Sequence, residues 1–321
     1  MPFAPNNPVK NDRVQEHGAF GGLTTSDLDL AATLSSGQAF RWTRVPGDSS
    51  AFAGTIGRRR ARLAQTPNGT VTWQADGPDA QAALRDYLRL GDADLPALAK
   101  AWCAADAHFA DAWARQPGVR VLRQDPAECF FSFLCASVAP IARISGMLRA
   151  VAQNFGEPLG DVDGVPLFAF PTAVQLARAD EQTLRDLGLG FRARRVHEAA
   201  RVLSTLPPDW VHVLRDAPYP DAKQALLSFF GVGEKIADCV CLFALDKNDA
   251  IPVDVHIWRI AQSVYAPELA KKSLTPANYA RAGDAFRDRF GPFAGWAQQT
   301  LFYRAAVGRK IYPEPRLGPG L

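Results

Sequence analysis

The residues best equipped for chemistry lie between positions 221 and 258. One predicted helix ends at Phe229-Phe230, the turn Gly231-Val232-Gly233 follows, and a second predicted helix begins near Glu234. Glycines at both ends of a short turn expose backbone N–H groups, which can hold a phosphate at the N-terminus of the following helix. An ordinary helix–turn–helix corner uses the same glycines for steric reasons, so the turn alone leaves both interpretations open.

Lys235 is the candidate nucleophile of this segment. It lies in the first turn of the second predicted helix, where its amine can point back over the glycine turn. A lysine amine attacks only in its neutral form, which desolvation and a helix N-terminus both favour. Cys239 lies four residues further on and shares the same helix face. A solvated lysine beside a packed cysteine is the plainer interpretation of this pair.

Asp254 is the second candidate. In PVDVHIW (252–258) it follows an extended, proline-containing stretch and precedes an apolar helix, which is the position of an N-cap. Most aspartates at such positions only cap the helix. A carboxylate that caps a helix can also face a pocket, so both roles are open.

Composition limits the class of protein that could use these residues. The chain has 321 residues, 47% of them hydrophobic, which excludes global disorder. It has no apolar run approaching the roughly 18 residues of a membrane helix and no signal-peptide pattern at its start. Five cysteines, an odd number, predict reduced thiols. The net charge of +3 lies wholly in residues 221–321, which carry 13 basic and 10 acidic side chains.

Two kinds of periodicity divide the chain into the elements that must position these residues. Residues 39–45, 51–57, 59–65 and 70–75 alternate with a period of two, and Thr66-Pro-Asn-Gly69 is a hairpin-turn signal, so we expect an antiparallel sheet. From Asp79 onward the period is helical. Predicted helix starts are Asp125, Thr172, Asp180, Asp221, Asp254 and Thr275, and glycines suited to helix ends are Gly188, Gly190, Gly231 and Gly291. The predicted organisation is a flexible leader (1–22), a sheet domain with flanking helices (23–118) and a helical catalytic domain (119–321).

Several blocks of the sequence resemble one known family. Residues 231–258, GVGEKIADCVCLFALDKNDAIPVDVHIW, are similar to the helix-hairpin-helix and catalytic loop of the 8-oxoguanine DNA glycosylase/AP lyase family. The resemblance extends, in the family's order, over about residues 23 to 303. It implies an α+β fold, with an N-terminal antiparallel β-sheet domain followed by an all-α helix-hairpin-helix glycosylase domain. The other matching blocks are LSSGQAFRW (34–42), GVRVLRQDPAECFFSFLCAS (118–137), IARI (141–144), LGLGFRARRV (187–196) and GPFAGWAQQTLF (291–302).

The resemblance implies a bifunctional reaction on duplex DNA in base excision repair. Lys235 would attack C1′ of the damaged nucleoside and form a Schiff base, and Asp254 would stabilise the positive charge that develops on the sugar. The Schiff base would make the 2′ proton acidic and allow β-elimination of the 3′ phosphate. Because C1′ is inaccessible in an intact stack, the damaged nucleotide must first be flipped out of the duplex.

The family's damaged-base pocket maps onto four residues. Gly37 would present its carbonyl to the N7–H that distinguishes 8-oxoguanine from guanine. Cys239 and Phe302 would sandwich the flipped base, and Gln298 would contact its Watson–Crick edge. Without the resemblance, Gly37 is explained by turn geometry, Phe302 by core packing and Gln298 by an exposed surface position.

The family's DNA contacts map onto a second group. Phe191 would be the wedge that fills the gap in the helix, and Arg192 and Arg143 would contact the orphaned partner base. His256 would contact a phosphate near the lesion, as would the hairpin backbone of Gly231, Val232 and Gly233. The plainer interpretations are a basic helix start for 191–195, a solvated charge for Arg143 and a surface histidine for His256.

The sequence departs from the family at three places. Val138-Ala139-Pro140 stands where the family has consecutive asparagines, one of which normally contacts the opposite cytosine. Val138 cannot hydrogen-bond, so we expect relaxed discrimination among the bases opposite the lesion. Ala305 replaces an acid of the family near His256, and Phe191 replaces a tyrosine.

Three other classes of protein compete with the bifunctional enzyme as an interpretation of this sequence. A monofunctional alkylpurine glycosylase on the same scaffold has no need of Lys235, and a non-catalytic helix-hairpin-helix module has no need of Lys235, Asp254 and the 34–42 block together. An iron–sulfur relative is disfavoured, because no cysteine follows Cys241. We therefore expect an enzyme with no cofactor or metal that binds double-stranded DNA containing 8-oxoguanine, works as a monomer and is not bound to a membrane. Its expected location is cytoplasmic if bacterial and nuclear if eukaryotic.

Overall fold

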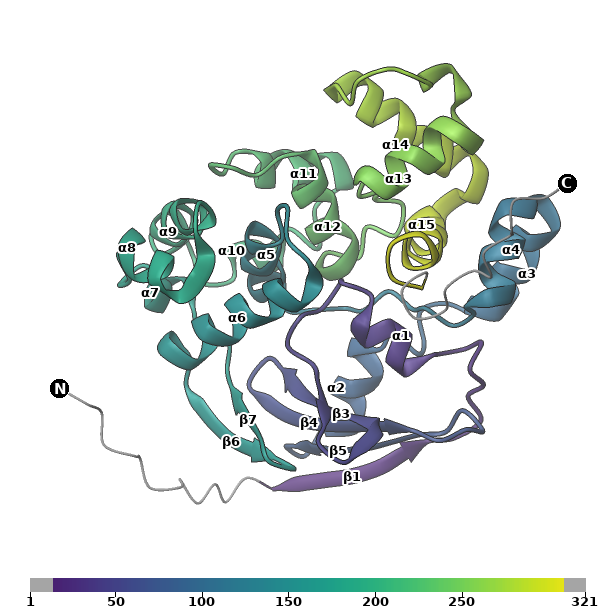
Figure 1. Ribbon diagram of the computed structural model, residues 1–321. Helices are drawn as coiled ribbons and strands as arrows, with labels where there is room; N and C mark the ends of the chain where they lie inside the picture. The colour runs from purple at the N-terminus through teal and green to yellow at the C-terminus, as the bar shows by residue number, and fades with distance from the viewer. Residues whose placement is uncertain (1–13, 309–321) are drawn as a thin grey trace, which may run out of the picture.

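The computed structural model describes residues 14–308, which form a sheet half and a helical half (Figure 1). The sheet has five antiparallel strands in the order β1-β5-β4-β3-β2. The predicted α+β fold class is confirmed. The strands are β1 (Gln15–Phe20), β2 (Thr43–Val45), β3 (Asp48–Ile56), β4 (Arg59–Gln65) and β5 (Val71–Asp76).

One face of this sheet is packed against α1 (Leu30–Ser35) and α2 (Ala80–Tyr87). In β5, Val71, Trp73 and Ala75 are buried while the residues between them are exposed, which is the alternation expected of a strand with one face on a core. The predicted strand at 39–45 is shorter than expected. Only residues 43–45 pair, because residues 38–40 are buried against the helices instead.

The leader prediction is wrong over part of its length. Residues 15–20 form the edge strand β1, paired with β5 from Gln15 opposite Asp76 to Phe20 opposite Val71. Phe20 packs against Trp73, with ring centroids 6.0 Å apart. Backbone pairing and this aromatic contact hold the segment, which its polar composition did not indicate. Residues 1–13 lie outside the described residues.

A second sheet of two strands covers the other face. β6 (Pro158–Val162) and β7 (Val165–Phe168) form a hairpin whose turn residues, Asp163 and Gly164, have φ of +51° and +77°. Val162, Val165 and Leu167 pack against residues of β3 and β4. This hairpin corrects the all-α description of residues 119–321. An Asp-Gly pair between two apolar residues is a hairpin signal that the sequence analysis missed.

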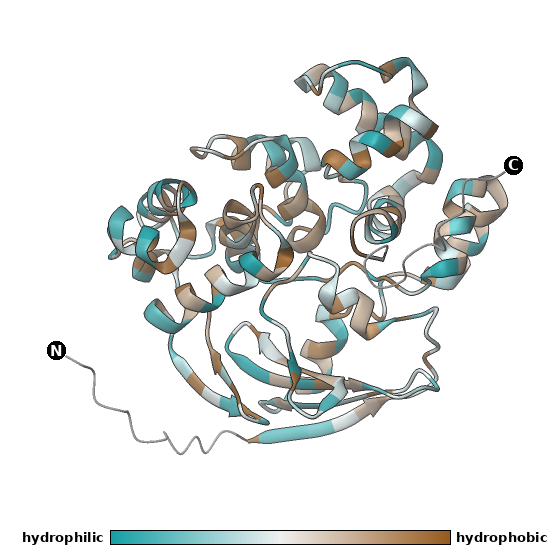
Figure 2. Ribbon diagram, viewed as in Figure 1, coloured by the Kyte–Doolittle hydropathy of each residue, from teal (hydrophilic) through white to brown (hydrophobic). Residues whose placement is uncertain are grey.

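The helical half is built around two adjacent buried helices, α5 and α12, where the hydrophobic colouring of Figure 2 is concentrated. Asp125, Thr172, Asp180, Asp254 and Thr275 all cap helices with their side chains, as predicted, whereas Asp221 lies inside the first turn of its helix. No helix within residues 14–308 is long and apolar enough to span a membrane. The helical segments are α5 (Pro126–Cys135), α6 (Ile141–Phe155), α7 (Ala173–Leu176), α8 (Glu181–Leu184), η1 (Arg185–Leu189), α9 (Arg192–Leu203), α10 (Trp210–Val213), α11 (Tyr219–Leu227), α12 (Glu234–Ala244), α13 (Val255–Ile260), η2 (Ala261–Tyr265), η3 (Pro267–Leu269), α14 (Pro276–Phe290), η4 (Gly291–Phe293), α15 (Ala294–Phe302) and η5 (Tyr303–Gly308).

The predicted division at residue 118 does not coincide with the division between the two cores. α3 (Leu95–Ala105) and α4 (Ala107–Arg115) precede that point but pack into the core of the helical half. The indole of Trp102 donates to the carbonyl of Phe290 at 3.1 Å, and Phe109 packs edge-on against Trp102. The chain thus crosses from the sheet half to the helical half and back before α5 begins.

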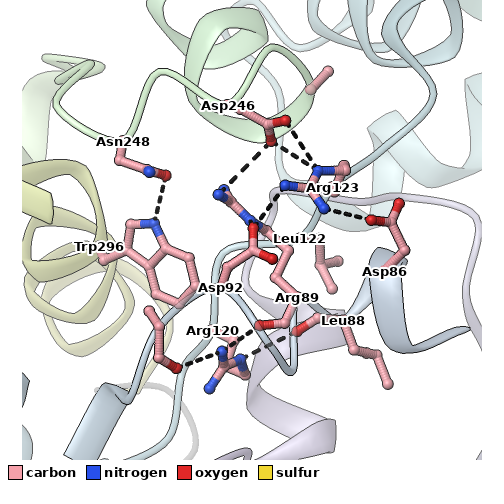
Figure 3. A network of polar contacts seen from close by, with 12 residues as sticks. Asp86, Leu88, Arg89, Asp92, Arg120, Leu122, Arg123, Asp246, Asn248 and Trp296 are labelled. Atoms are coloured by element: carbon pink, nitrogen blue, oxygen red, sulfur yellow. Dashed lines mark hydrogen bonds and ion pairs between the residues drawn. The ribbon is translucent and has the colours of Figure 1, made fainter. Parts of the chain in front are cut away.

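An arginine cluster, formed by Arg89, Arg120 and Arg123, joins the two halves beside Trp296 of α15 (Figure 3). Arg120, only 2% exposed, donates to the carbonyls of Asp27, Leu88, Arg89 and Ala93 at 2.5 to 3.1 Å. Burial and the neighbouring Arg89 lower its pKa to about 10, so it remains charged at neutral pH.

The same cluster holds the indole of Trp296 on α15. The guanidinium carbons of Arg89 and Arg120 lie 5.0 and 5.2 Å from the Trp296 ring, and the indole N–H donates to the Asn248 side chain at 3.0 Å. Arg123 contacts both oxygens of Asp246 at 2.9 and 3.0 Å, close to the end of α12. Charged groups of the sheet half therefore fix the position of α15 and of the chain that follows α12.

Candidate active site

The predicted hairpin lies between α11 and α12. Gly231 has a φ of +78°, and a Cβ at this position would lie 2.6 Å from the Arg195 side chain, so both backbone conformation and space require glycine. Gly233 is the N-cap of α12 and offers no side-chain cap. Both glycines are exposed and Val232 is buried, so the turn presents backbone N–H groups at the surface. This is the geometry predicted for phosphate binding.

Lys235 lies in the first turn of α12 and is partly buried. Its Nζ is 5.3 Å from the centre of the Phe133 ring, and its side chain hydrogen-bonds Cys239. Burial raises the pKa of the Cys239 thiol to about 12, against the opposing charge of Lys235. Cys239 is therefore a protonated, apolar wall beside the amine of Lys235.

Asp254 is the N-cap of α13. Its Oδ1 accepts from the N–H groups of His256 and Ile257, both at 2.9 Å. Both bonds use the same oxygen, which leaves Oδ2 outside the cap. Asp254 also lines a cavity with Lys235, so the capping and pocket-facing roles left open by the sequence coexist.

All six residues predicted for catalysis and base recognition line this one cavity, which is open to solvent and has an empty volume of about 310 Å³. They come from both halves of the molecule: Gly37 follows α1, while the others lie on α12, at the start of α13 and on α15. The exposed position considered for Gln298 is wrong, since its side chain is 2% exposed. The cavity is lined by Gly37, Phe133, Lys235, Cys239, Phe243, Pro252, Asp254, Gln298, Gln299 and Phe302.

The conformation of Gly37, in the loop after α1, is fixed by its surroundings. Its φ is +82°, and a Cβ here would lie 3.0 Å from Ile141 Cδ1. The next residue, Gln38, is fully buried. Its amide donates to the Arg120 carbonyl at 2.7 Å and accepts from Leu122 N–H at 2.8 Å. These bonds fix the peptide that carries the Gly37 carbonyl.

The predicted wedge and its arginine have different environments. Phe191 is 52% exposed at the start of α9, as a wedge must be. Arg192 is 2% exposed, and its guanidinium donates to the carbonyls of Ser137 (2.9 Å through Nε) and Val138 (3.1 Å). The predicted contact of Arg192 with a partner base stays a prediction. In this structure Arg192 is buried and holds the loop between α5 and α6.

That loop presents Val138 at its tip. Val138 is 95% exposed and has a φ of +50°, a strained conformation for a β-branched residue. Arg195 also contacts the loop, through Ser137 Oγ at 2.8 Å, and its side chain packs on Gly231. Two arginines of α9 thus connect the strained loop, the Phe191 wedge and the hairpin.

The remaining predicted DNA contacts lie at the surface of the helical half. Arg143 is exposed in the first turn of α6. His256 is partly buried on α13, and its ring lies 6.1 Å from Phe302, edge to face. Phe302, from the cavity wall, is thus one neighbour of His256 in this chain, where Ala305 replaces the family's acid.

A buried polar group behind the cavity escaped the sequence analysis. Asp238 on α12 is 1% exposed and accepts from the hydroxyls of Tyr219 and Tyr279, both at 2.6 Å, and from Lys223 at 3.1 Å. Tyr279 also accepts from the Val253 N–H at 3.1 Å. This hydroxyl therefore links the helix that carries Lys235 to the loop that carries Asp254. The sequence signal that could have indicated this buried group is an acidic residue in the middle of an apolar helix. Within residues 14–308, no group of three or more His, Cys, Asp or Glu side chains is arranged to hold a metal ion.

Comparisons with known proteins agree with this geometry. Residues 22–130 match the family described as 8-oxoguanine DNA glycosylase, N-terminal domain, and residues 132–279 match the HhH-GPD superfamily of base excision DNA repair proteins. The chain is 37% identical to N-glycosylase/DNA lyase OGG1 of Arabidopsis thaliana, over 90% of this chain and 80% of that protein. It is 32% identical to the N-glycosylase/DNA lyase of Saccharomyces cerevisiae, over 89% of this chain and 85% of that protein.

A solved structure extends the comparison to three dimensions. The 8-oxoguanine glycosylase/lyase of Clostridium acetobutylicum, in complex with double-stranded DNA containing cytosine opposite 8-oxoguanine, superposes with a TM-score of 0.77 at 25% identity. The match covers 87% of this chain and 92% of that one. The chain belongs to the 8-oxoguanine DNA glycosylase family, whose members are DNA N-glycosylases and AP lyases of the HhH-GPD superfamily.

Proposed function

We propose that this enzyme excises 8-oxoguanine from duplex DNA and cleaves the resulting abasic site, in base excision repair. The observation that carries the proposal is the single cavity that collects Lys235 and Asp254 beside Gly37, Cys239, Gln298 and Phe302. A nucleophilic amine, a carboxylate, two flat apolar walls and a buried amide together match the needs of a flipped, oxidised purine nucleoside.

Lys235 and Asp254 divide the chemistry. The lone pair of the Lys235 amine forms a bond to C1′ as the bond between C1′ and the base breaks, and the base leaves with the electron pair of the broken bond. Asp254 Oδ2, free of the helix cap, stabilises the positive charge that develops on the sugar. Opening of the sugar ring gives a Schiff base with Lys235, which acidifies the 2′ proton. Loss of that proton expels the 3′ phosphate.

The other cavity residues select the base. Cys239, neutral because of its raised pKa, and Phe302 pack on the two faces of the flipped base. The Gly37 carbonyl accepts from the N7–H that guanine lacks, and Gln298 reads the Watson–Crick edge. A buried acceptor left unpaired by guanine costs about 1–3 kcal/mol, which is a discrimination of roughly 5- to 150-fold.

Residues on the surface around the cavity bind the DNA duplex. The hairpin N–H groups of Gly231, Val232 and Gly233 and the side chain of His256 bind phosphates near the lesion. Phe191 enters the helix beside the flipped nucleotide, and exposed Arg143 contacts the partner base. One chain supplies the amine, the carboxylate and the base pocket, so a monomer is sufficient for the reaction, in the compartment that contains the DNA.

Borohydride trapping on a duplex containing 8-oxoguanine tests the proposal. We expect a covalent protein–DNA adduct with the natural chain and none with Lys235→Gln, because borohydride reduces only a Schiff base. Asp254→Asn should keep the cap and bind DNA, yet lose about 100-fold or more in excision rate. Lys272→Gln, at an exposed lysine away from the cavity, is the matched control and should be trapped normally.

The assignment fails in two distinguishable ways. Robust trapping of Lys235→Gln would reject Lys235 as the nucleophile. An excision rate that Asp254→Asn leaves unchanged would reduce Asp254 to a helix cap.

A further inference from the structure

Gln299 brings a second buried amide to the cavity, beside that of Gln298. Both side chains are 2% exposed and line the cavity on α15. Gln298 Oε1 and Gln299 Nε2 are both buried without a hydrogen-bond partner. Neither the sequence motifs nor the proposed roles account for Gln299.

An unpaired buried amide is costly, and native proteins keep few of them. Among residues 14–308, six buried side-chain atoms lack a partner, and two of the six belong to these neighbouring glutamines in the cavity of Lys235. The buried glutamines outside the cavity differ. Gln38, for instance, uses both ends of its amide in hydrogen bonds to the backbone. Two unpaired amide atoms on adjacent residues of one cavity indicate hydrogen-bonding capacity that a ligand can use.

The two unpaired atoms have complementary chemistry. Gln298 Oε1 is an acceptor and Gln299 Nε2 is a donor, side by side on one helix. An oxidised purine carries ring N–H donors next to carbonyl oxygens, so an adjacent acceptor and donor fit its edge. The apolar walls, Phe133, Phe243 and Phe302, offer no competing partner to either amide.

We propose that Gln299 is a second base-reading residue, which donates a hydrogen bond from Nε2 to a carbonyl oxygen of the flipped purine. The proposal rests on the proposed function, because it takes 8-oxoguanine as the ligand of the cavity. Recognition then depends on an exocyclic oxygen, contacted by Gln299, as well as on the N–H groups contacted by Gly37 and Gln298.

The test replaces the amide by an apolar group of similar shape. In Gln299→Met we expect single-turnover excision of 8-oxoguanine to fall about tenfold, the value of one buried hydrogen bond. The melting temperature of the free protein should stay the same or rise, because an unpaired polar group has been removed. A residue with a merely structural role would lose stability together with activity.

Gln116→Met is the matched control. Gln116 is also buried, but it lies outside the cavity and its amide donates to Asp29 at 2.8 Å. This variant should lose stability and keep the natural excision rate, which is the reverse pattern.

Binding of uncleavable 2′-fluoro duplexes identifies the oxygen. If Gln299→Met weakens binding of 8-oxoguanine but not of 8-oxoadenine, which lacks the C6 carbonyl, the donor reads the C6 oxygen. Equal weakening of both assigns the C8 oxygen.

An excision rate within twofold of the natural rate in Gln299→Met, or a parallel loss of stability and activity, would overturn the inference. Failure of the natural chain to excise 8-oxoguanine in the same assay would instead reject the proposed function.

Discussion

The cavity and the arginine cluster both contact α15, but their buried polar groups differ in whether they have hydrogen-bond partners. In the arginine cluster, Arg120 makes four bonds to carbonyls, and Arg123 binds both oxygens of Asp246. In the cavity, the neighbouring amides of Gln298 and Gln299 each keep an unpaired atom. One short helix therefore contacts a cluster of paired polar groups and also carries two amides that each keep an unpaired atom.

The difference distinguishes buried polar groups that stabilise the fold from buried polar groups that are available to a ligand. A satisfied buried group has no free capacity for a ligand, and its loss harms the fold. An unsatisfied group costs stability in the free protein and recovers it when a ligand binds. Arg89 Nη1 in the arginine cluster also lacks a hydrogen bond, but its guanidinium faces the Trp296 ring. The comparison predicts that substitutions in the arginine cluster reduce stability, whereas substitution of the unpaired cavity amides reduces activity without reducing stability.

The largest expected effect is a loss of stability in the arginine cluster. Arg120→Met leaves four carbonyls without donors, so we expect the free energy of unfolding to fall by about 3–5 kcal/mol. Denaturant unfolding measures this loss. Arg115→Met is the control, because Arg115 is 53% exposed in a surface pair with Asp111, and it should cost under about 1 kcal/mol. Similar losses in the two variants would mean that the arginine cluster does not hold the halves together.

A smaller effect is expected for the hydrogen bonds around Asp238, which reach the loop that carries Asp254. Tyr279→Phe removes the acceptor of the Val253 N–H beside Asp254, so we expect about tenfold slower single-turnover excision with unchanged DNA affinity. Tyr219→Phe removes the other hydroxyl on Asp238 but leaves Val253 untouched. Both variants should lose about 1–2 kcal/mol of stability. If Tyr219→Phe slows excision as much as Tyr279→Phe does, then the link to Val253 does not position Asp254.

The smallest effect concerns the strained loop tip. Val138→Asn suits the left-handed conformation and restores a hydrogen-bonding group, so stability should rise by up to about 1 kcal/mol. The natural chain should excise 8-oxoguanine opposite all four bases within about tenfold of one another, and Val138→Asn should favour cytosine by a few-fold. Excision kinetics on the four duplexes measure both. A steep cytosine-only profile of the natural chain would contradict the prediction.

Much of the fold and the site was predictable because local signals carried it. Aspartate and threonine N-caps, glycines at helix ends and a period of two in the strands marked most elements correctly. The resemblance placed Lys235, Asp254 and the four base-pocket residues, and they line one cavity. These features depend on short stretches of sequence.

The failures involve contacts between distant segments. β1 was taken as a leader because its residues are polar, yet it is held by pairing with β5. α3 and α4 were assigned to the sheet domain by their order in the chain, but their side chains fit the helical core. The burial of Arg192 was also not predictable, because only the fold brings the Ser137 and Val138 carbonyls to its guanidinium.

The position of α15 has a consequence for how this enzyme can be divided or recombined. Its nine residues carry Trp296 to the arginines of the sheet half and Gln298, Gln299 and Phe302 to the cavity, while Gly37 reaches the cavity from the sheet half. A helical half expressed alone would lack both the Gly37 carbonyl and the support of α15. We expect neither half to recognise the base by itself, so exchange of parts between relatives must keep the two halves matched.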